Sequence, residues 1–149
     1  MIKFRAWDKK TKSFINDCDI VLDLISGKVY AGDIGLTDSI NDVTDQIVLM
    51  QSTGFKDNND TEVFEGDVIN IHWFYADFDP VELGAFENEE YAERVIVKKE
   101  FGSFGFWWEE ADSWVDLATL AMSARLDEES FEILGNIYEN AELLKGAIK

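Results

Sequence analysis

The chain has 149 residues, of which 31 are Asp or Glu and 13 are Lys or Arg, so its formal net charge is −18. This balance argues against direct binding to nucleic acid or to an anionic membrane surface, because affinity for both comes mainly from Lys and Arg. The single cysteine, Cys18, excludes an internal disulfide, and no stretch approaches the roughly 18 apolar residues of a membrane span.

The same features predict the compartment and the number of domains. Residues 1–5 lack the apolar run of a signal peptide, so we expect a cytosolic protein with no membrane association. The length suits one domain over residues 1–149, and an apolar content of 46% is enough for a core without a metal or disulfide.

The N-terminal third predicts short strands separated by turns. Alternation of polar and apolar residues around a charged turn predicts a hairpin over residues 3–15. Strands at 20–25 and 29–31 follow, with a tight turn between them, and then a polar loop over 32–45. The apolar run at 46–51 predicts a strand buried on both faces.

The middle of the chain predicts further strands and one acidic irregular segment. An Asp/Asn cluster at 57–62 favours a turn, and Val68–Trp73 alternates as a strand does. Residues 76–93 contain many carboxylates without clear periodicity, so we expect them to be irregular. Strands are expected again at 94–98 and 101–108.

Two short helices are expected towards the C-terminus. Ser113 followed by Asp116 matches a capping box, and apolar residues recur after it at helical spacing. Asn140 is the expected N-cap of the second helix, and a strand over 131–138 is expected between them.

Three blocks, taken together and in order, resemble the YopX-like family of phage and prophage proteins. The opening KFRAWD at 3–8 resembles the start of that family. The segments LMQSTGFKDN at 49–58 and VFEGDVI at 63–69 resemble its "TGLKDKNGKEIYEGDIV" pattern. GNIYENAELL at 135–144 is similar to its "GNIYENPELL" ending.

The sequence departs from the family pattern at three positions, where Phe55 replaces Leu, Asp60 replaces the turn Gly and Ala141 replaces Pro. Losing that Gly makes a two-residue turn less favourable, so a longer turn is expected at 57–61. The resemblance implies a mostly β (β-rich α+β) fold, a YopX-like single domain of twisted antiparallel sheets and barrel-like hairpins with one or two short C-terminal helices. The resemblance also implies a protein of the bacterial cytosol. Because the family has no defined active-site residues, it assigns no catalytic residue to this chain.

Two candidate sites fail on inspection of the residues. His72 is the only histidine, and Cys18 lies far from it with no local signature, so a Cys–His pair is disfavoured against a histidine that packs on a strand. An EF-hand loop starting at Asp57 would place Glu62 where Gly is needed and Val68 where Glu is needed. We therefore assign no catalytic residue, no cofactor and no metal site.

Two acidic groups remain as candidate contact residues for a partner. Asp77 and Asp79 form a D-x-D pair near Glu82, a pattern that can hold a divalent cation but lacks any nearby nucleophile or phosphate-binding loop. An exposed acidic loop is the alternative interpretation.

The other group is Trp107-Trp108-Glu109-Glu110. Adjacent tryptophans on a strand face opposite ways, so one can pack in the core while the other reaches the surface and suits an interface. The alternative is that the following helix covers both.

Three functions stay open from the sequence. The first is a non-enzymatic phage accessory protein that contacts a protein partner, possible partners being a basic protein or a second copy of the chain. The second is an acidic mimic of nucleic acid, centred on residues 77–93 and 107–116, that occupies a nucleic-acid-binding protein of the host. The third is a carboxylate-based enzyme that uses Asp77, Asp79 or Glu82.

Overall fold

The structure, a computed structural model, describes residues 2–16, 19–32, 40–81 and 84–141. Most of these residues lie in strands, all strand pairs are antiparallel, and the described part contains one α-helix. The mostly β fold with a short helix late in the chain is therefore confirmed. The chain divides into two compact units, residues 1–51 and 52–149, which are described separately below.

The first unit contains two small sheets. β1 (Phe4–Asp8) pairs with β2 (Ser13–Phe14) and with the first half of β6 (Ile47–Lys56). β3 (Asp19–Leu22), β4 (Val29–Gly32) and β5 (Asn41–Asp42) form the other sheet. The two predicted hairpins of this region are thus both present. Cys18 lies outside the described residues.

The buried Asp8 carboxylate shapes the turn after β1. It accepts hydrogen bonds from the backbone N–H of Lys10 (2.8 Å) and from Gln46 Nε2 (3.0 Å). Burial opposes ionisation of Asp8, but these bonds together outweigh it and lower its pKa.

β6 changes partner along its length. Residues 47–51 pair with β1, whereas Ser52 and Lys56 pair with β7 (Glu62–Phe64) across an irregularity. The connecting turn is longer than two residues, as the missing glycine predicted, and the Asp57 N–H donates to the Thr61 carbonyl at 2.8 Å.

The second unit is built on β8 (Asp67–Asp79) and β9 (Gly84–Ile96), which pair along nearly their whole length. β13 (Phe131–Asn136) pairs with the first part of β8. β10 (Lys98–Glu100), β11 (Ser103–Trp108) and β12 (Ser113–Asp116) form a second sheet. The core of this unit is made by side chains from these strands, from β7 and from the helix, among them Val63, Ile69, Ile71, Trp73, Val95, Phe106, Leu117 and Phe131.

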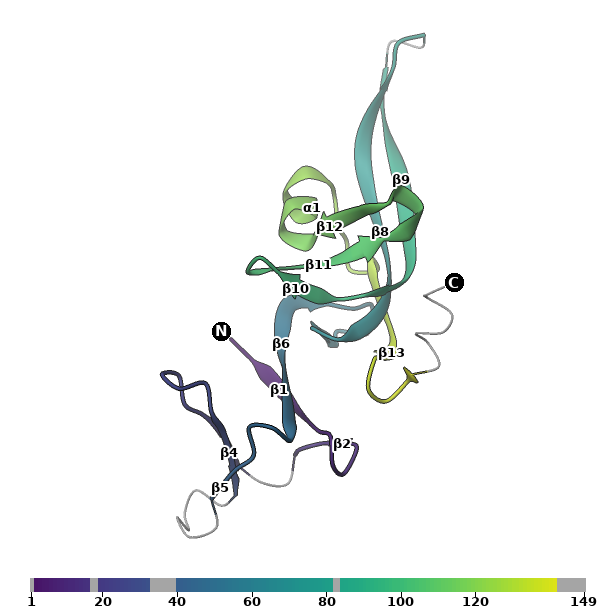
Figure 1. The fold of residues 1–149 in the computed structure, drawn as a ribbon. Coiled ribbons are helices and arrows are strands. Elements are labelled where there is room, and N and C mark those ends of the chain that lie inside the picture. The colour runs from purple at the N-terminus through teal and green to yellow at the C-terminus, as the bar shows by residue number, and fades with distance from the viewer. Residues whose placement is uncertain (1, 17–18, 33–39, 82–83, 142–149) are drawn as a thin grey trace. The chain divides into compact units, whose positions relative to one another are not determined.

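The prediction of an irregular segment at 76–93 is wrong. These residues form the distal part of β8 and most of β9, a long twisted hairpin that extends beyond the other strands of the unit (Figure 1). Ala92, near the core end of β9, is buried. Most of the other residues in this range are exposed, so the segment shows no apolar alternation.

The first predicted helix begins later than expected. Ser113–Asp116 is strand β12, and the helix α1 covers Leu117–Ser123. Asp116 is its N-cap, with its carboxylate accepting from the Thr119 N–H at 3.0 Å. The helix predicted from Asn140 falls mainly on residues outside the described part of the chain. No helix among the described residues has the length and hydrophobicity needed to cross a membrane.

Candidate functional site

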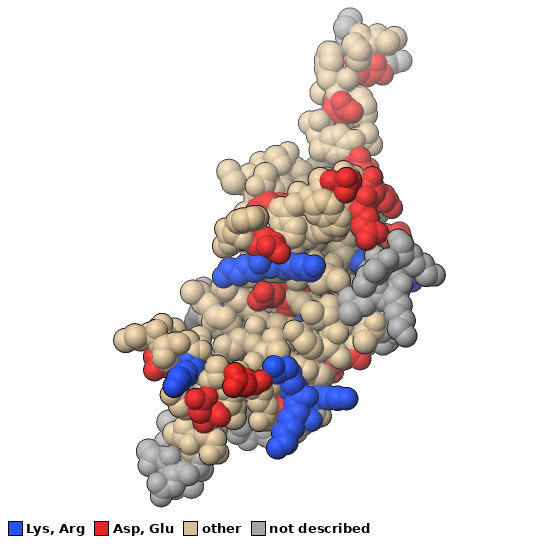
Figure 2. Space-filling model, in the orientation of Figure 1, with Lys and Arg blue, Asp and Glu red and all other residues tan. Residues whose placement is uncertain are grey.

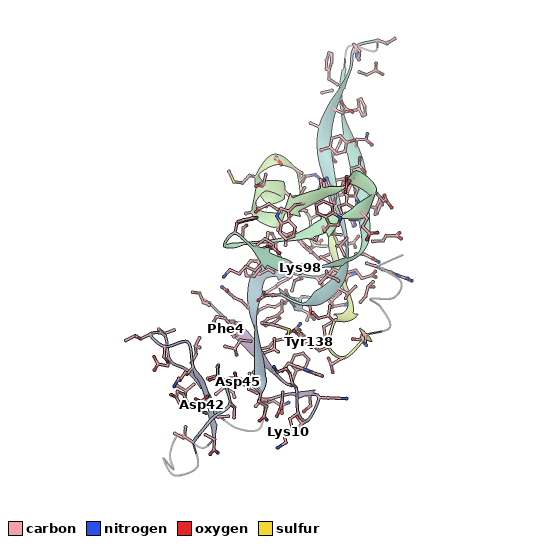
Figure 3. All side chains as sticks on the ribbon, in the orientation of Figure 1. Phe4, Lys10, Asp42, Asp45, Lys98 and Tyr138 are labelled. Carbon is pink, nitrogen blue, oxygen red and sulfur yellow. The ribbon has the colours of Figure 1, made fainter. Side chains whose placement is uncertain are left out.

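The main surface feature of the second unit is the distal hairpin, defined as residues 74–89. The first part of β8 is buried, with Val68, Ile69 and Ile71 at most 1% exposed. Beyond Trp73 the exposure rises, and Figure 3 shows side chains standing on both sides of the hairpin ribbon. A hairpin that leaves its core in this way offers both faces and its strand edges to a partner.

Exposed apolar side chains lie near the end of the distal hairpin. Phe78 is 59% exposed, Phe86 46% and Val81, in the connecting turn, 87%. Exposed aromatic side chains on a projecting element are typical of protein contact surfaces, because interfaces are enriched in aromatic residues.

The distal hairpin is also uniformly acidic. Residues 73–93 contain no Lys or Arg, and residues 61–110 together carry a net charge of −10. Figure 2 shows acidic side chains at intervals along the projecting part of the hairpin. The surface therefore combines aromatic contact area with negative potential.

Arg125 holds the distal hairpin where it leaves the core. Its Nη2 and Nε donate to the two oxygens of Glu87 at 2.6 Å and 3.0 Å. Its guanidinium lies 4.2 Å from the centre of the Phe74 ring, and its backbone exchanges two hydrogen bonds with Phe74. The hydrogen bonds from Arg125 lower the pKa of Glu87, and those to Glu87 raise the pKa of Arg125.

His72 lies beside Tyr91, nearer the core, on the face of the β8–β9 hairpin that also carries Glu87 and Glu89. Its Nε2 is 3.8 Å from a Glu89 oxygen, and the centres of the His72 and Tyr91 rings are 5.3 Å apart. Hydrogen bonding to Glu89 raises the pKa of the Tyr91 hydroxyl. A hollow of about 270 Å³ opens here, and the residues that line it include His72, Tyr91, Glu93, Glu129 and Glu132.

The structure places the predicted Asp77 and Asp79 on one face of the distal hairpin, near its end. The Asp77 carboxylate accepts from the Phe78 N–H at 2.8 Å, and the Asp79 carboxylate from the Val81 N–H at 2.9 Å. Within the described residues, no group of three or more His, Cys, Asp or Glu side chains is arranged to hold a metal ion. Glu82 lies outside those residues, and the enzyme hypothesis stays a prediction.

The predicted tryptophan pair lies on a different surface, and its two members face opposite ways. Trp108 packs on the core with its ring 5.2 Å from that of Trp73 in an edge-on arrangement. Trp107 is 47% exposed and lies opposite Trp114 on the outer face of the sheet. Glu109 and Glu110 are exposed in the short 3₁₀ turn η2 (Glu109–Ala111) that follows.

Sequence reasoning missed two residues of the distal hairpin, Phe78 and Phe86, and also Arg125, which contacts it through Glu87. The signal for the phenylalanines was present, because aromatic residues recur in a segment that otherwise has the composition of a solvated loop. Arg125 gives no such signal, since its contact with Glu87 joins residues far apart in the sequence.

Comparison with known proteins gives a family and similar solved structures. The family model described as YopX protein matches residues 3–145. The crystal structure of protein EF1440 from Enterococcus faecalis is similar with a TM-score of 0.52 and 25% identity, over 97% of this chain and 98% of that one. No curated protein matches the chain significantly.

Proposed function

The chain belongs to the YopX protein family, and from that premise we propose that it is a phage or prophage accessory protein that binds a protein partner through its distal hairpin. The observation that carries this proposal is the exposure of Phe78, Val81 and Phe86 on an element that projects from its unit. We also propose that the protein is encoded in a phage or prophage genome and acts in the bacterial cytosol, as its resemblance to the family implies.

The charge of the distal hairpin favours a basic partner over a second copy of the chain. Contact between two such hairpins would bring carboxylates such as Asp77, Glu87 and Glu89 close to their counterparts, and like charges in an interface oppose binding. A basic partner meets the same groups favourably and associates faster because of long-range attraction.

The aromatic residues distinguish this proposal from mimicry of nucleic acid, the second candidate function. A mimic binds mainly through its carboxylates, and such binding is screened by salt over about 10 Å at 0.1 M. The absence of Lys and Arg from residues 73–93 supports mimicry, whereas buried aromatic contacts would survive high salt.

Affinity capture from bacterial lysate with matched variants tests the proposal. Phe78→Ser combined with Phe86→Ser removes the exposed rings, and Met122→Ser, at a side chain that is 89% exposed on α1, is the control. We expect the wild type and the control to retain one defined basic protein and the double variant to lose it. Capture of the same protein by all three would contradict a contact through the distal hairpin.

The salt dependence separates the two candidate functions in the same experiment. Retention of the partner at about 0.5 M salt supports aromatic anchoring, whereas complete loss at that salt supports mimicry. Light scattering across the same salt range tests self-association, and a dimer that is stable at low salt would favour a second copy as the partner.

A further inference from the structure

The outer edge of β9 is open in the described part of the structure. The sheet order is β13-β8-β9, and β9 pairs only with β8 among the described strands. An open strand edge presents N–H and C=O groups that another chain can pair with. The direction of these groups decides which residues such a chain would meet.

The hydrogen bonds of β8 fix that direction. The His72 N–H donates to the Ser130 carbonyl and the Phe74 N–H to the Arg125 carbonyl. The backbone N–H and C=O groups of His72 and Phe74 therefore point away from β9. Backbone groups alternate sides along an antiparallel strand. The backbone groups of the alternate residues therefore point towards β9. These residues are Trp73, Tyr75 and Asp77, and they pair with Glu90, Asn88 and Phe86.

The intervening residues of β9 direct their backbone groups outwards. These are Ala85, Glu87, Glu89 and Tyr91, whose side chains share one face of the hairpin. The regular edge ends near Arg94, which has a φ of 53°. The open edge thus covers residues 85–91, a length typical of a natural strand.

One outward amide on this edge is already occupied by a neighbouring side chain. The Glu89 N–H donates to Asn88 Oδ1 at 3.0 Å, and Asn88 Nδ2 in turn donates to the Tyr75 hydroxyl at 3.0 Å. Asn88 therefore competes with any incoming strand for the amide at the middle of the edge.

On these grounds we propose that residues 85–91 of β9 accept an extended basic segment of the partner as an added antiparallel or parallel strand. This inference rests on the proposed function and adds the binding mode to it. An added strand would place its side chains beside Glu87 and Glu89 on the same face. Glu87 already pairs with Arg125, so the argument for a basic occupant rests on Glu89 and on the absence of Lys and Arg from residues 73–93. Two copies of β9 would instead bring these glutamates together, so self-pairing is disfavoured.

A designed peptide tests the binding mode without knowledge of the partner. The probe is a short peptide of alternating lysine and valine, compared with the same peptide N-methylated at alternate residues and with a glutamate–valine peptide. We expect the lysine–valine peptide to bind and to slow hydrogen exchange at the Ala85 and Glu87 amides. The N-methylated peptide keeps the charge but loses several backbone hydrogen bonds, so its affinity should fall by roughly tenfold or more.

A gain in affinity is expected from removing the competing side chain. Asn88→Ala frees the Glu89 N–H for the added strand, so the lysine–valine peptide should bind roughly fivefold more tightly. Asn59→Ala, at an exposed turn position, is the control and should leave the affinity unchanged.

The outcomes separate this inference from the proposed function. Equal affinity for the N-methylated peptide, or no binding of the lysine–valine peptide, overturns strand addition but leaves the contact tested by Phe78 and Phe86 in place. Equal affinity for the glutamate–valine peptide overturns the choice of a basic occupant. If the Phe78/Phe86 double variant still captures the partner while the peptide results support strand addition, only the phenylalanine contact is overturned.

Discussion

Asp60 occupies a backbone conformation that an L-residue rarely adopts. Its φ is 64°, in the turn where the family pattern has glycine. Aspartate tolerates this conformation better than most residues because its short side chain can bond locally, but it still carries a steric penalty that glycine lacks. The exposed pair between Lys56 and Asp60, at 3.3 Å, offsets little of that penalty.

We therefore predict that Asp60→Gly stabilises the protein. The relief of strain outweighs the greater flexibility of the unfolded chain, and the expected gain is about 0.5–1 kcal/mol. The midpoint of urea unfolding measures it. Gly54→Ala is the matched control, because Gly54 has a φ of 84° and an added Cβ should lower the midpoint. A lower midpoint for Asp60→Gly would show that the aspartate side chain stabilises this turn.

At the scale of single residues, the sequence predicted those features whose cause lies in neighbouring residues of the chain. The lengthened turn at 57–61 followed from the missing glycine, and the opposite orientations of Trp107 and Trp108 followed from strand geometry. The burial of the Asp57 carboxylate was not foreseen. It accepts from the N–H groups of Asn59 and Thr61, and Asn58 of the same turn donates its N–H to Phe131, a contact from a distant strand.

At the scale of elements, Asp116 joins strand β12 to helix α1. Its carboxylate accepts from the Thr119 N–H at 3.0 Å, and hydrogen bonds from Ser103 first, and then from Thr119, lower its pKa. Asp116→Ala removes the cap and should lower the free energy of unfolding by about 1 kcal/mol at neutral pH. Asp116→Asn, which can still cap the helix, should lose less.

The pH dependence of this effect has a defined sign. Because the pKa of Asp116 is lower in the folded protein, its ionised form stabilises the fold above the unfolded pKa of about 3.9, and this contribution is lost as the pH falls through the folded pKa. The difference in urea midpoint between wild type and Asp116→Ala should therefore be smaller at about pH 3 than at about pH 7. An equal difference at both pH values would mean that the carboxylate acts without its charge.

Gly105 determines how the outer face of the β10–β11–β12 sheet packs. An added Cβ would lie 2.6 Å from Trp114 Cζ2 and closer still to the Val115 carbonyl oxygen. Since a backbone oxygen cannot move aside as a flexible side chain can, Gly105→Ala should destabilise the protein by about 1–3 kcal/mol. Urea unfolding measures the loss, and a red shift of tryptophan emission is expected as Trp114 moves into water. An unchanged midpoint would contradict the close contact.

The elements that the sequence failed to predict are those whose pattern is set by distant partners. The distal hairpin lacks alternation because, beyond Tyr75, most of its residues are exposed whichever face they lie on, so they resemble a loop although they pair as strands. Ser113 and Asp116 matched a capping box, but Trp114 pairs with Trp107 of β11, and that pairing keeps the segment extended. The secondary-structure propensity of the residues in each segment could not predict either strand pairing.

At the scale of the whole molecule, the charge distribution could be predicted and its functional placement could not. The excess of carboxylates in residues 61–110 was evident from the sequence. Only the structure shows that many of them lie with Phe78 and Phe86 on one projecting hairpin and that Arg125 anchors it. The proposed contact surface therefore depends on strand register, which sets which side chains share a face.

The expectation of a single domain can be tested through β6, the strand that both units share. Residues 47–51 of β6 pair with β1, and its later residues pair with β7. If the chain is one cooperative domain, disrupting the first half of β6 should lower the stability of both units equally. Met50 suits this test because it is 2% exposed and lies in the first unit.

We predict that Met50→Ala lowers the urea midpoints of the β1 amides and the β8 amides together, by an amount that corresponds to about 2–5 kcal/mol. Hydrogen exchange at increasing urea follows both sets of amides in one sample. A fall confined to the β1 amides would show that residues 1–51 unfold as a separate domain. Because β6 runs without a break from residues of the first unit into residues of the second, we expect loss of order in its first half to spread to its second half and to give one transition.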